Sequence, residues 1–249
     1  MGEKSTLPTF QPLDPAALTN TQVRSFTPSM VRTVGCAIVF WTKPYDRNVA
    51  LATAEKAKAR GSVRKAVRWF RKVIDNAPQD FQTRAKIAPL LARLRRRDEA
   101  KTHFDVAAAG FLALGFAPKA IAVWTVAANT FPEHVEYWER IANEQVRRGA
   151  RQDAVLSLLH GRAMLRKKRQ RPLAQLLLRQ VLALEGTHLE ATLDLADLLR
   201  RDGVREESRR LLAVVLGVAA GNSQRRRVRF AQFRLEPTFR GALNWALAR

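Results

Sequence analysis

The sequence predicts an all-α fold: a row of about ten antiparallel helices built on a repeat of 54 residues. One spacing pattern begins at Gly61, returns at Gly115 and returns again at Arg169, and both 115−61 and 169−115 equal 54. In each copy an alanine is followed four residues later by a large apolar residue. The aligned positions are Gly61, Ala66, Phe70, Val73 and Pro78; Gly115, Ala120, Trp124, Ala127 and Pro132; and Arg169, Ala174, Leu178, Val181 and Gly186. Such repetition is typical of stacked-repeat proteins, because each unit must bury its apolar face against its neighbour.

A second set of apolar positions recurs at the same interval. Its members are Ile87-Ala88, Ile141-Ala142 and Leu195-Ala196, followed by Ala100, Ala154 and Ser208. Hydrophobic residues make up 47% of the chain, an ordinary share for a folded protein. Trp69, Trp124 and Trp138 occupy large-residue positions of the repeat, so we expect them in the core rather than on a ligand platform.

Start and stop signals place the helices in order. Asp46 is a plausible N-cap of the first helix, and glycine, proline or arginine-rich turns separate the others. The predicted helices span 47–60, 64–76, 82–94, 98–114, 118–130, 135–148, 152–168, 172–185, 190–201 and 206–217. Pro118 and Pro172 fall in a first helical turn, where the missing N–H is tolerated. Pro89 falls inside the third helix and should kink it or delay its start.

These residues resemble the tetratricopeptide repeat (TPR) family. Trp138-x2-Ile141-Ala142, followed by Ala154-x3-Leu158, is similar to the family's pattern of an aromatic residue, Leu-Gly, and a later alanine and aromatic residue. Ala66-x3-Phe70 with Pro78 and Ala120-x3-Trp124 with Pro132 match the second half of that pattern. The resemblance covers roughly residues 47–216. It implies a TPR-like α-solenoid and, by analogy of fold, binding of other proteins.

The sequence departs from the family in its period. A TPR-like unit has two helices in 34 residues, and 95−61 and 149−115 equal 34, but 115−95 and 169−149 equal 20. The helices at 98–114 and 152–168 therefore close one unit and open the next, and the true period is three helices. Since short loops make sequential helices antiparallel, a three-helix period reverses direction from one unit to the next.

This reversal predicts a basic ridge along one edge of the solenoid. The turns at 61–63, 95–97, 131–134, 169–171 and 202–205 should share that edge. The ridge residues are Arg60, Arg64, Arg95, Arg96, Arg97, Lys167, Lys168, Arg169, Arg171, Arg200 and Arg201. They either form a binding surface for phosphate or carboxylate groups or are solvated turns that keep the protein soluble.

Two further surfaces are candidate sites. A partner-binding groove should be lined by exposed residues of the helices whose alanine-rich faces pack together. These are Arg84, Arg140, Asn143, Glu144, Asp194 and Asp197. After Gly221, basic and apolar residues alternate from Arg225 to Leu235, which suggests an extended, strand-like segment. The tail residues singled out are Arg225, Arg226, Arg227, Arg229, Phe230 and Phe233. They either track an anionic backbone while stacking bases or cap the last helix.

The predicted domains are a flexible leader (1–28), an N-terminal cap (29–45), the repeat domain (46–217) and a basic, aromatic C-terminal tail or cap (218–249). Cys36 is the only cysteine, so an intrachain disulfide is excluded and a cytoplasmic location is expected. No catalytic constellation, phosphate-binding glycine loop or metal-ligand cluster is apparent in the sequence. We therefore expect no enzyme activity, cofactor or metal.

The formal net charge of +22 favours acidic partners. The first hypothesis is a cytoplasmic scaffold that binds another protein, through an acidic peptide or helix. The alternative is an RNA- or DNA-binding protein that uses the arginine-rich edge and the tail. Attachment of the tail to an anionic membrane surface ranks below both.

Overall fold

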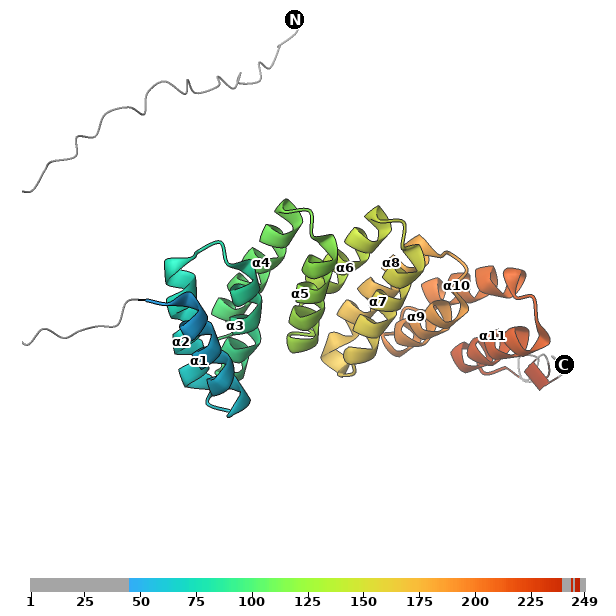
Figure 1. Cartoon of the computed structure of the whole chain (residues 1–249). Coiled ribbons are helices and arrows are strands. Elements are labelled where there is room, and N and C mark those ends of the chain that lie inside the picture. The colour runs from blue at the N-terminus through green and yellow to red at the C-terminus, as the bar shows by residue number, and fades with distance from the viewer. Residues whose placement is uncertain (1–44, 239–242, 244, 247–249) are drawn as a thin grey trace, which may run out of the picture. The chain divides into compact units, whose positions relative to one another are not determined.

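The computed structural model describes residues 45–238, 243, 245 and 246, and this part of the chain contains eleven α-helices and no strand. The helices are α1 (Arg47–Ala59), α2 (Val63–Asn76), α3 (Phe81–Arg93), α4 (Arg97–Ala113), α5 (Ala117–Thr130), α6 (Glu136–Arg147), α7 (Arg151–Met164), α8 (Arg171–Leu184), α9 (Leu189–Arg201), α10 (Arg205–Val218) and α11 (Asn222–Leu235). They follow one another in chain order (Figure 1). The predicted all-α solenoid of antiparallel helices is confirmed. Within the described residues, every helix is too short or too polar to span a lipid bilayer.

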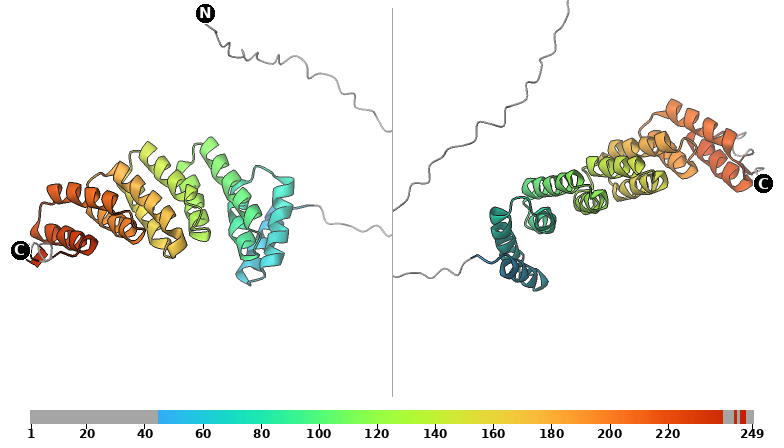
Figure 2. Two further views of the ribbon diagram at one scale, coloured as in Figure 1. Left: turned by 180° about the vertical axis from the view of Figure 1, so that it is seen from behind. Right: turned by 45° about the horizontal axis from the view of Figure 1, so that its top comes forward.

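The helices form two layers, because each helix also meets the helix two places further on. Lys86 of α3 lies 2.8 Å from Glu55 of α1, and Arg162 of α7 donates a 2.8 Å hydrogen bond to Asp194 of α9. Between even-numbered helices, Arg140 of α6 donates a 2.7 Å hydrogen bond to Asp105 of α4. Odd-numbered helices therefore form one layer and even-numbered helices the other. The two further views of Figure 2 show the same succession of helices.

Equivalent helices of the 54-residue repeat alternate between the layers. The equivalent helices α3, α6 and α9 are each three helices apart, so α6 lies in the even layer and α3 and α9 in the odd layer. Ion pairs across neighbouring turns agree with this antiparallel order. Arg97 at the start of α4 pairs with Glu133 before α6, and Arg47 of α1 pairs with Asp80, the N-cap of α3. The start of a helix therefore lies beside the start of the helix after next.

Five helices end in the same C-terminal turn. In this turn one residue adopts positive φ, and the N–H of the next residue bonds back to the carbonyl five residues earlier, which satisfies orphan carbonyls. Glycine takes the positive-φ place at Gly61, Gly115, Gly149 and Gly203, with φ between 73° and 85°. Arg95 takes it at the end of α3, with φ 64°. It is the one non-glycine residue with positive φ in the described part of the chain.

The core is one continuous cluster from α1 to α9, built from small and large side chains in alternation. Trp138, Phe70 and Phe104 are its largest fully buried side chains, and Trp124, which is 7% exposed, belongs to the same cluster. Trp69 is only half-buried, so the expected place in the core holds fully for Trp124 and Trp138 alone among the three tryptophans. Two helical glycines allow aromatic rings to approach a neighbouring backbone: Phe81 lies against Gly110 and Trp138 lies against Gly161. α11 packs through a separate small cluster on α9 and α10.

The ten predicted helices all exist, but two local expectations are wrong. The predicted strand-like tail at 225–235 is the helix α11, because Val228, Ala231 and Leu235 turn to one side at helical spacing and pack toward α9 and α10. α3 starts at Phe81, so Pro89 does not delay its start, and the kink expected at Pro89 stays a prediction. The helix predicted for 152–168 ends at Met164, and a short 3₁₀ turn, Lys168–Gln170, precedes α8. The predicted leader and all but the last residue of the predicted N-terminal cap lie outside the described residues.

Candidate basic interface

A stripe of cations follows one face of α2. Arg64, Arg68, Arg71 and Lys72 stand at positions i, i+4, i+7 and i+8, the spacing that places side chains on one side of a helix. The other side of α2 is apolar and packs into the core, which fixes the stripe toward solvent. With a rise of 1.5 Å per residue, the stripe from Arg64 to Lys72 is about 12 Å long.

The stripe forms one wall of a hollow that the α3–α4 turn closes. Val67 of α2 and Leu94 supply its apolar floor, and Arg96 stands on the opposite wall. Asp75 is the only carboxylate in the lining. Glu99 of α4 accepts a 2.5 Å hydrogen bond from Arg71 and lies 2.7 Å from Arg96. These two arginines are therefore partly neutralised, whereas Arg64 and Arg68 make no ion pair with any described residue.

The α2 hollow contains residues that the sequence reasoning missed. Arg68, Arg71 and Lys72 are absent from the predicted ridge, because that prediction counted only residues at turns. Their i, i+4, i+7, i+8 spacing in an amphipathic helix is the signal that identifies them. Arg64 and Arg96 were predicted, and the structure brings both into the lining of the hollow.

The predicted ridge residues lie at or next to helix ends, and carboxylates engage five of the eleven. That they share one edge stays a prediction. Arg96 pairs with Glu99, Arg97 with Glu133 and Arg171 with Asp202, and Arg200 and Arg201 both pair with Asp197. The others are exposed and have no ion pair with a described residue: Arg60, Arg64, Arg95, Lys167, Lys168 and Arg169. They fall into two groups, one around α2 and the α3–α4 turn and one in the α7–α8 turn.

The six predicted groove residues do not meet in one groove. Arg84 donates a hydrogen bond to the Pro78 carbonyl, and Glu144 is buried beside Arg147. The other residues divide between the layers: Arg140 and Asn143 belong to α6, and Asp194 and Asp197 belong to α9. The physical reason is the three-helix period, which places equivalent positions of successive units in opposite layers.

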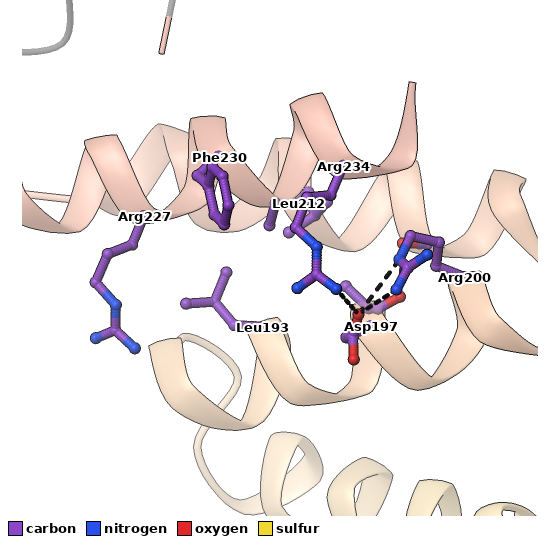
Figure 3. Close-up of a pocket in the computed structure, with 10 residues that line it drawn as sticks. Leu193, Asp197, Arg200, Leu212, Arg227, Phe230 and Arg234 are labelled. Atoms are coloured by element: carbon purple, nitrogen blue, oxygen red, sulfur yellow. Dashed lines mark hydrogen bonds and ion pairs between the residues drawn. The ribbon is translucent and has the colours of Figure 1, made fainter. Parts of the chain in front are cut away.

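A second pocket, of about 210 Å³, lies between α9 and α11 near the C-terminal end of the described chain (Figure 3). Asp197 of α9 accepts a 2.8 Å hydrogen bond from Arg200, lies 2.7 Å from Arg201 and lies 3.4 Å from Arg234 of α11. Burial works against ionisation of the Asp197 carboxyl, but the hydrogen bond from Arg200 and the charges of Arg201 and Arg234 outweigh it. Its pKa therefore lies below the usual value.

The predicted tail residues belong to α11, and several of them hold this helix in place. Arg225 donates a 2.9 Å hydrogen bond to the Ala219 carbonyl, and Arg227 donates a 2.7 Å hydrogen bond to Glu190 of α9. Arg226 lies over the Trp245 ring. Phe230 is 41% exposed, whereas Arg229 and Phe233 are half-buried. These contacts support the predicted cap more than a free basic arm.

In the described residues, no group of histidine, cysteine or carboxylate side chains is arranged to hold a metal ion. His188 is the N-cap of α9 and accepts a hydrogen bond from the Ala191 N–H, a structural role. His134, its equivalent one period earlier, lies in the turn before α6 between Phe131 and Tyr137.

No protein-family model matches the chain, and no curated protein matches it. Similar solved structures include PilW, a widely conserved type IV pilus biogenesis factor, with 13% identity, 81% of this chain and 90% of that chain covered, and a TM-score of 0.36. YrrB, a TPR protein with an unusual peptide-binding site, is 12% identical over 80% of this chain and 90% of that chain, with a TM-score of 0.31. Pseudomonas aeruginosa pilF is 14% identical over 81% and 88%, with a TM-score of 0.27. These are likenesses of helical fold, and the TPR resemblance itself rests on the repeat pattern of the sequence.

Proposed function

We propose that this protein is a non-catalytic scaffold that binds an acidic segment of another protein in the α2 hollow. The observation that carries the proposal is the row of Arg64, Arg68, Arg71 and Lys72 beside an apolar floor, with Asp75 as the only carboxylate in the lining. Fixed cations of one sign attract acidic partners and speed their association. The single cysteine of the chain fits a role in the cytoplasm.

The spacing of the cations favours an acidic helix as the bound segment. Side chains four residues apart on a helix are about 6 Å apart along its axis. A partner helix with carboxylates at every fourth position would therefore match Arg64, Arg68 and Lys72 one to one. Its apolar side chains would meet Val67 and Leu94, and burial of apolar surface would add affinity that salt does not screen.

The conformation of Arg95 gives independent support. A non-glycine residue in the left-handed region costs roughly 1–2 kcal/mol relative to glycine. Four equivalent turns avoid this cost with glycine, and only the turn beside the α2 hollow carries an arginine. Backbone strain of this kind is concentrated at functional sites. Arg95 stands in the chain between Leu94 and Arg96, which both line the hollow, and its side chain is exposed. We therefore infer that it adds a further cation at the rim.

Charge reversal in the α2 hollow tests the proposal. We expect Arg64→Glu/Arg68→Glu to weaken binding of a synthetic helical peptide with glutamate at every fourth position by at least about tenfold, since two attractive contacts become repulsive. Titration calorimetry at low and physiological salt measures the change. The matched control is Arg148→Glu/Arg151→Glu, which makes the same charge change at exposed residues of the α6–α7 turn, on the other edge.

If both double variants lost the same peptide affinity, the loss would come from the change in net charge alone, and the proposal would be overturned. An unchanged peptide affinity together with lost binding of an RNA oligonucleotide would also overturn it and would support the nucleic-acid alternative. That alternative also predicts a steep linear dependence of log affinity on log salt that flattens when Arg225, Arg226 and Arg227 become alanine.

Arg95→Gly should separate stability from binding. Removal of the strained side chain is expected to raise the free energy of unfolding by about 1 kcal/mol, while loss of the rim cation weakens the glutamate peptide severalfold. Denaturant titration and calorimetry measure the two effects. The control is Gly115→Ala, where a Cβ would have no neighbour within 4 Å, so only the φ of 77° opposes it. Gly115→Ala should destabilise by a similar amount and leave binding unchanged.

A further inference from the structure

The pocket between α9 and α11 has an arginine-rich end that carries more positive than negative charge. Arg200, Arg201 and Arg234 surround the single carboxylate of Asp197. Arg200 and Arg201 approach within 2.8 Å and 2.7 Å, whereas Arg234 lies 3.4 Å away and about half of its side chain is exposed. One carboxylate cannot satisfy three guanidinium groups, so Arg234 has hydrogen-bond donors available to a second anion.

The rest of the pocket is an apolar slot. Leu193 of α9, Leu212 of α10 and the Phe230 ring of α11 form its walls (Figure 3). The centroid of the Trp245 ring lies 5.4 Å from that of Phe230, at an interplanar angle of 44°. This contact holds the Phe230 ring in position while 41% of the residue remains exposed. The Ser208 hydroxyl, also in the lining, is already donated to the Ala196 carbonyl.

We propose that this pocket binds a small aromatic carboxylate. The ring of the ligand would lie against Phe230 between Leu193 and Leu212, and its carboxylate would accept hydrogen bonds from the Arg234 guanidinium. Arginine is well suited to this task, because its planar fork matches a carboxylate. The pocket volume of about 210 Å³ lies below the roughly 300–1,000 Å³ of sites for drug-sized molecules, which restricts the ligand to a single ring.

Two other classes of small ligand, a small aliphatic carboxylate and a neutral aromatic alcohol, fit only one part of the pocket each. An acetate ion would leave the apolar walls hydrated, and a neutral aromatic alcohol would leave the Arg234 donors unpaired by charge. Both contacts are needed because an exposed ion pair alone, or a stacked ring pair alone, contributes little affinity. The proposal does not depend on the α2 hollow, which lies among other helices.

Titration of the full-length protein with phenylacetate, followed by amide chemical shifts, tests the proposal. We expect saturable shifts confined to α9, α10 and α11, and at least about tenfold weaker binding of acetate and of benzyl alcohol. Arg234→Gln should weaken phenylacetate binding at least fivefold. Arg210→Gln, an exposed arginine of the neighbouring α10 outside this pocket, should leave it unchanged.

A second variant distinguishes a lost contact between Arg234 and the ligand from disturbed packing of α11. Ala231→Leu fills the pocket from α11 without altering any charge, and it should abolish the shifts while the far-ultraviolet circular dichroism stays that of the parent. Saturable binding that survives Ala231→Leu would overturn the proposal. So would an unchanged phenylacetate affinity in Arg234→Gln, or the absence of saturable shifts in the parent. Normal phenylacetate binding by Arg64→Glu/Arg68→Glu is also expected, and its loss would count against an independent site.

Discussion

Trp138→Ala is expected to lower the free energy of unfolding by about 3–5 kcal/mol, the range for truncating a large buried aromatic side chain. Trp138 is only 2% exposed and lies on α6, in the middle of the described array. Its ring packs against Gly161 of α7, where a Cβ would come within 2.7 Å of it, and its centroid lies 5.3 Å from that of the His160 ring. Neighbours held this closely on helices cannot collapse to fill the space that alanine leaves.

Trp69→Ala is the matched control. The same side chain is removed, but Trp69 is half-buried and one face of its ring carries the Lys72 ammonium group at 4.5 Å. We expect the free energy of unfolding to fall by only about 1 kcal/mol, because the half-buried ring removes less apolar surface from water than the buried ring of Trp138. Similar losses for the two variants in urea-induced unfolding would contradict the central role of Trp138.

The shape of the unfolding curve provides a second readout for Trp138→Ala. In a linear repeat array each helix pair is stabilised mainly by its neighbours, so a weak central interface reduces the cooperativity between the two ends. We expect a broader transition in the variant, and two resolved steps if the halves separate. A single transition as steep as that of the parent would show that the coupling runs through other contacts.

Gly110→Ala is expected to destabilise the protein by about 1–3 kcal/mol, although alanine is the better helix former. A Cβ at this position of α4 would lie 2.3 Å from two carbons of the Phe81 ring. Phe81 also makes an edge-to-face contact with Phe111, at a centroid distance of 6.3 Å, so its ring cannot turn away without losing that contact. The clash therefore separates the start of α3 from α4.

Gly217→Ala provides the control for helix propensity. Gly217 lies in α10, and a Cβ there would have no neighbour within 4 Å. Without a clash, alanine should stabilise the protein by roughly 0.4–1 kcal/mol through the lower entropy of the unfolded chain. The two substitutions should thus shift the thermal midpoint in opposite directions, and a rise in both would mean that the Phe81 ring adapts freely.

The helices from α1 to α10 could be predicted from the sequence because their signals are local and repeated. The periodic alanines and large residues define the buried faces, and Gly61, Gly115, Gly149 and Gly203 end helices in the turns where they were expected. The same local reasoning failed for α11. Its arginines and aromatics alternate over a few residues, and only the packing of Val228 and Leu235 against other helices selects the helical spacing over the alternating one.

The candidate sites depend on which residues meet across helices, which a single sequence reports poorly. The ridge followed from the alternating direction of successive helices, and its position along one edge stays a prediction. The predicted groove combined Arg140 of α6 with Asp194 of α9, because its residues were chosen without regard to the two layers. These two helices lie in opposite layers. The α2 hollow needs both the stripe on α2 and the docking of Leu94 and Arg96 beside it, and the second half is a tertiary contact.

The alternation of the layers also sets a rule for how such an array can grow or shrink. Inserting one 54-residue unit after α5 would reverse the direction of every later helix and move it to the other layer. The two faces of the C-terminal half would therefore exchange sides relative to the N-terminal half. Only a pair of units, 2 × 54 residues, restores the original facing. Shortening by one unit has the same effect, and for this protein gene duplication in even steps is the only kind that keeps a continuous surface.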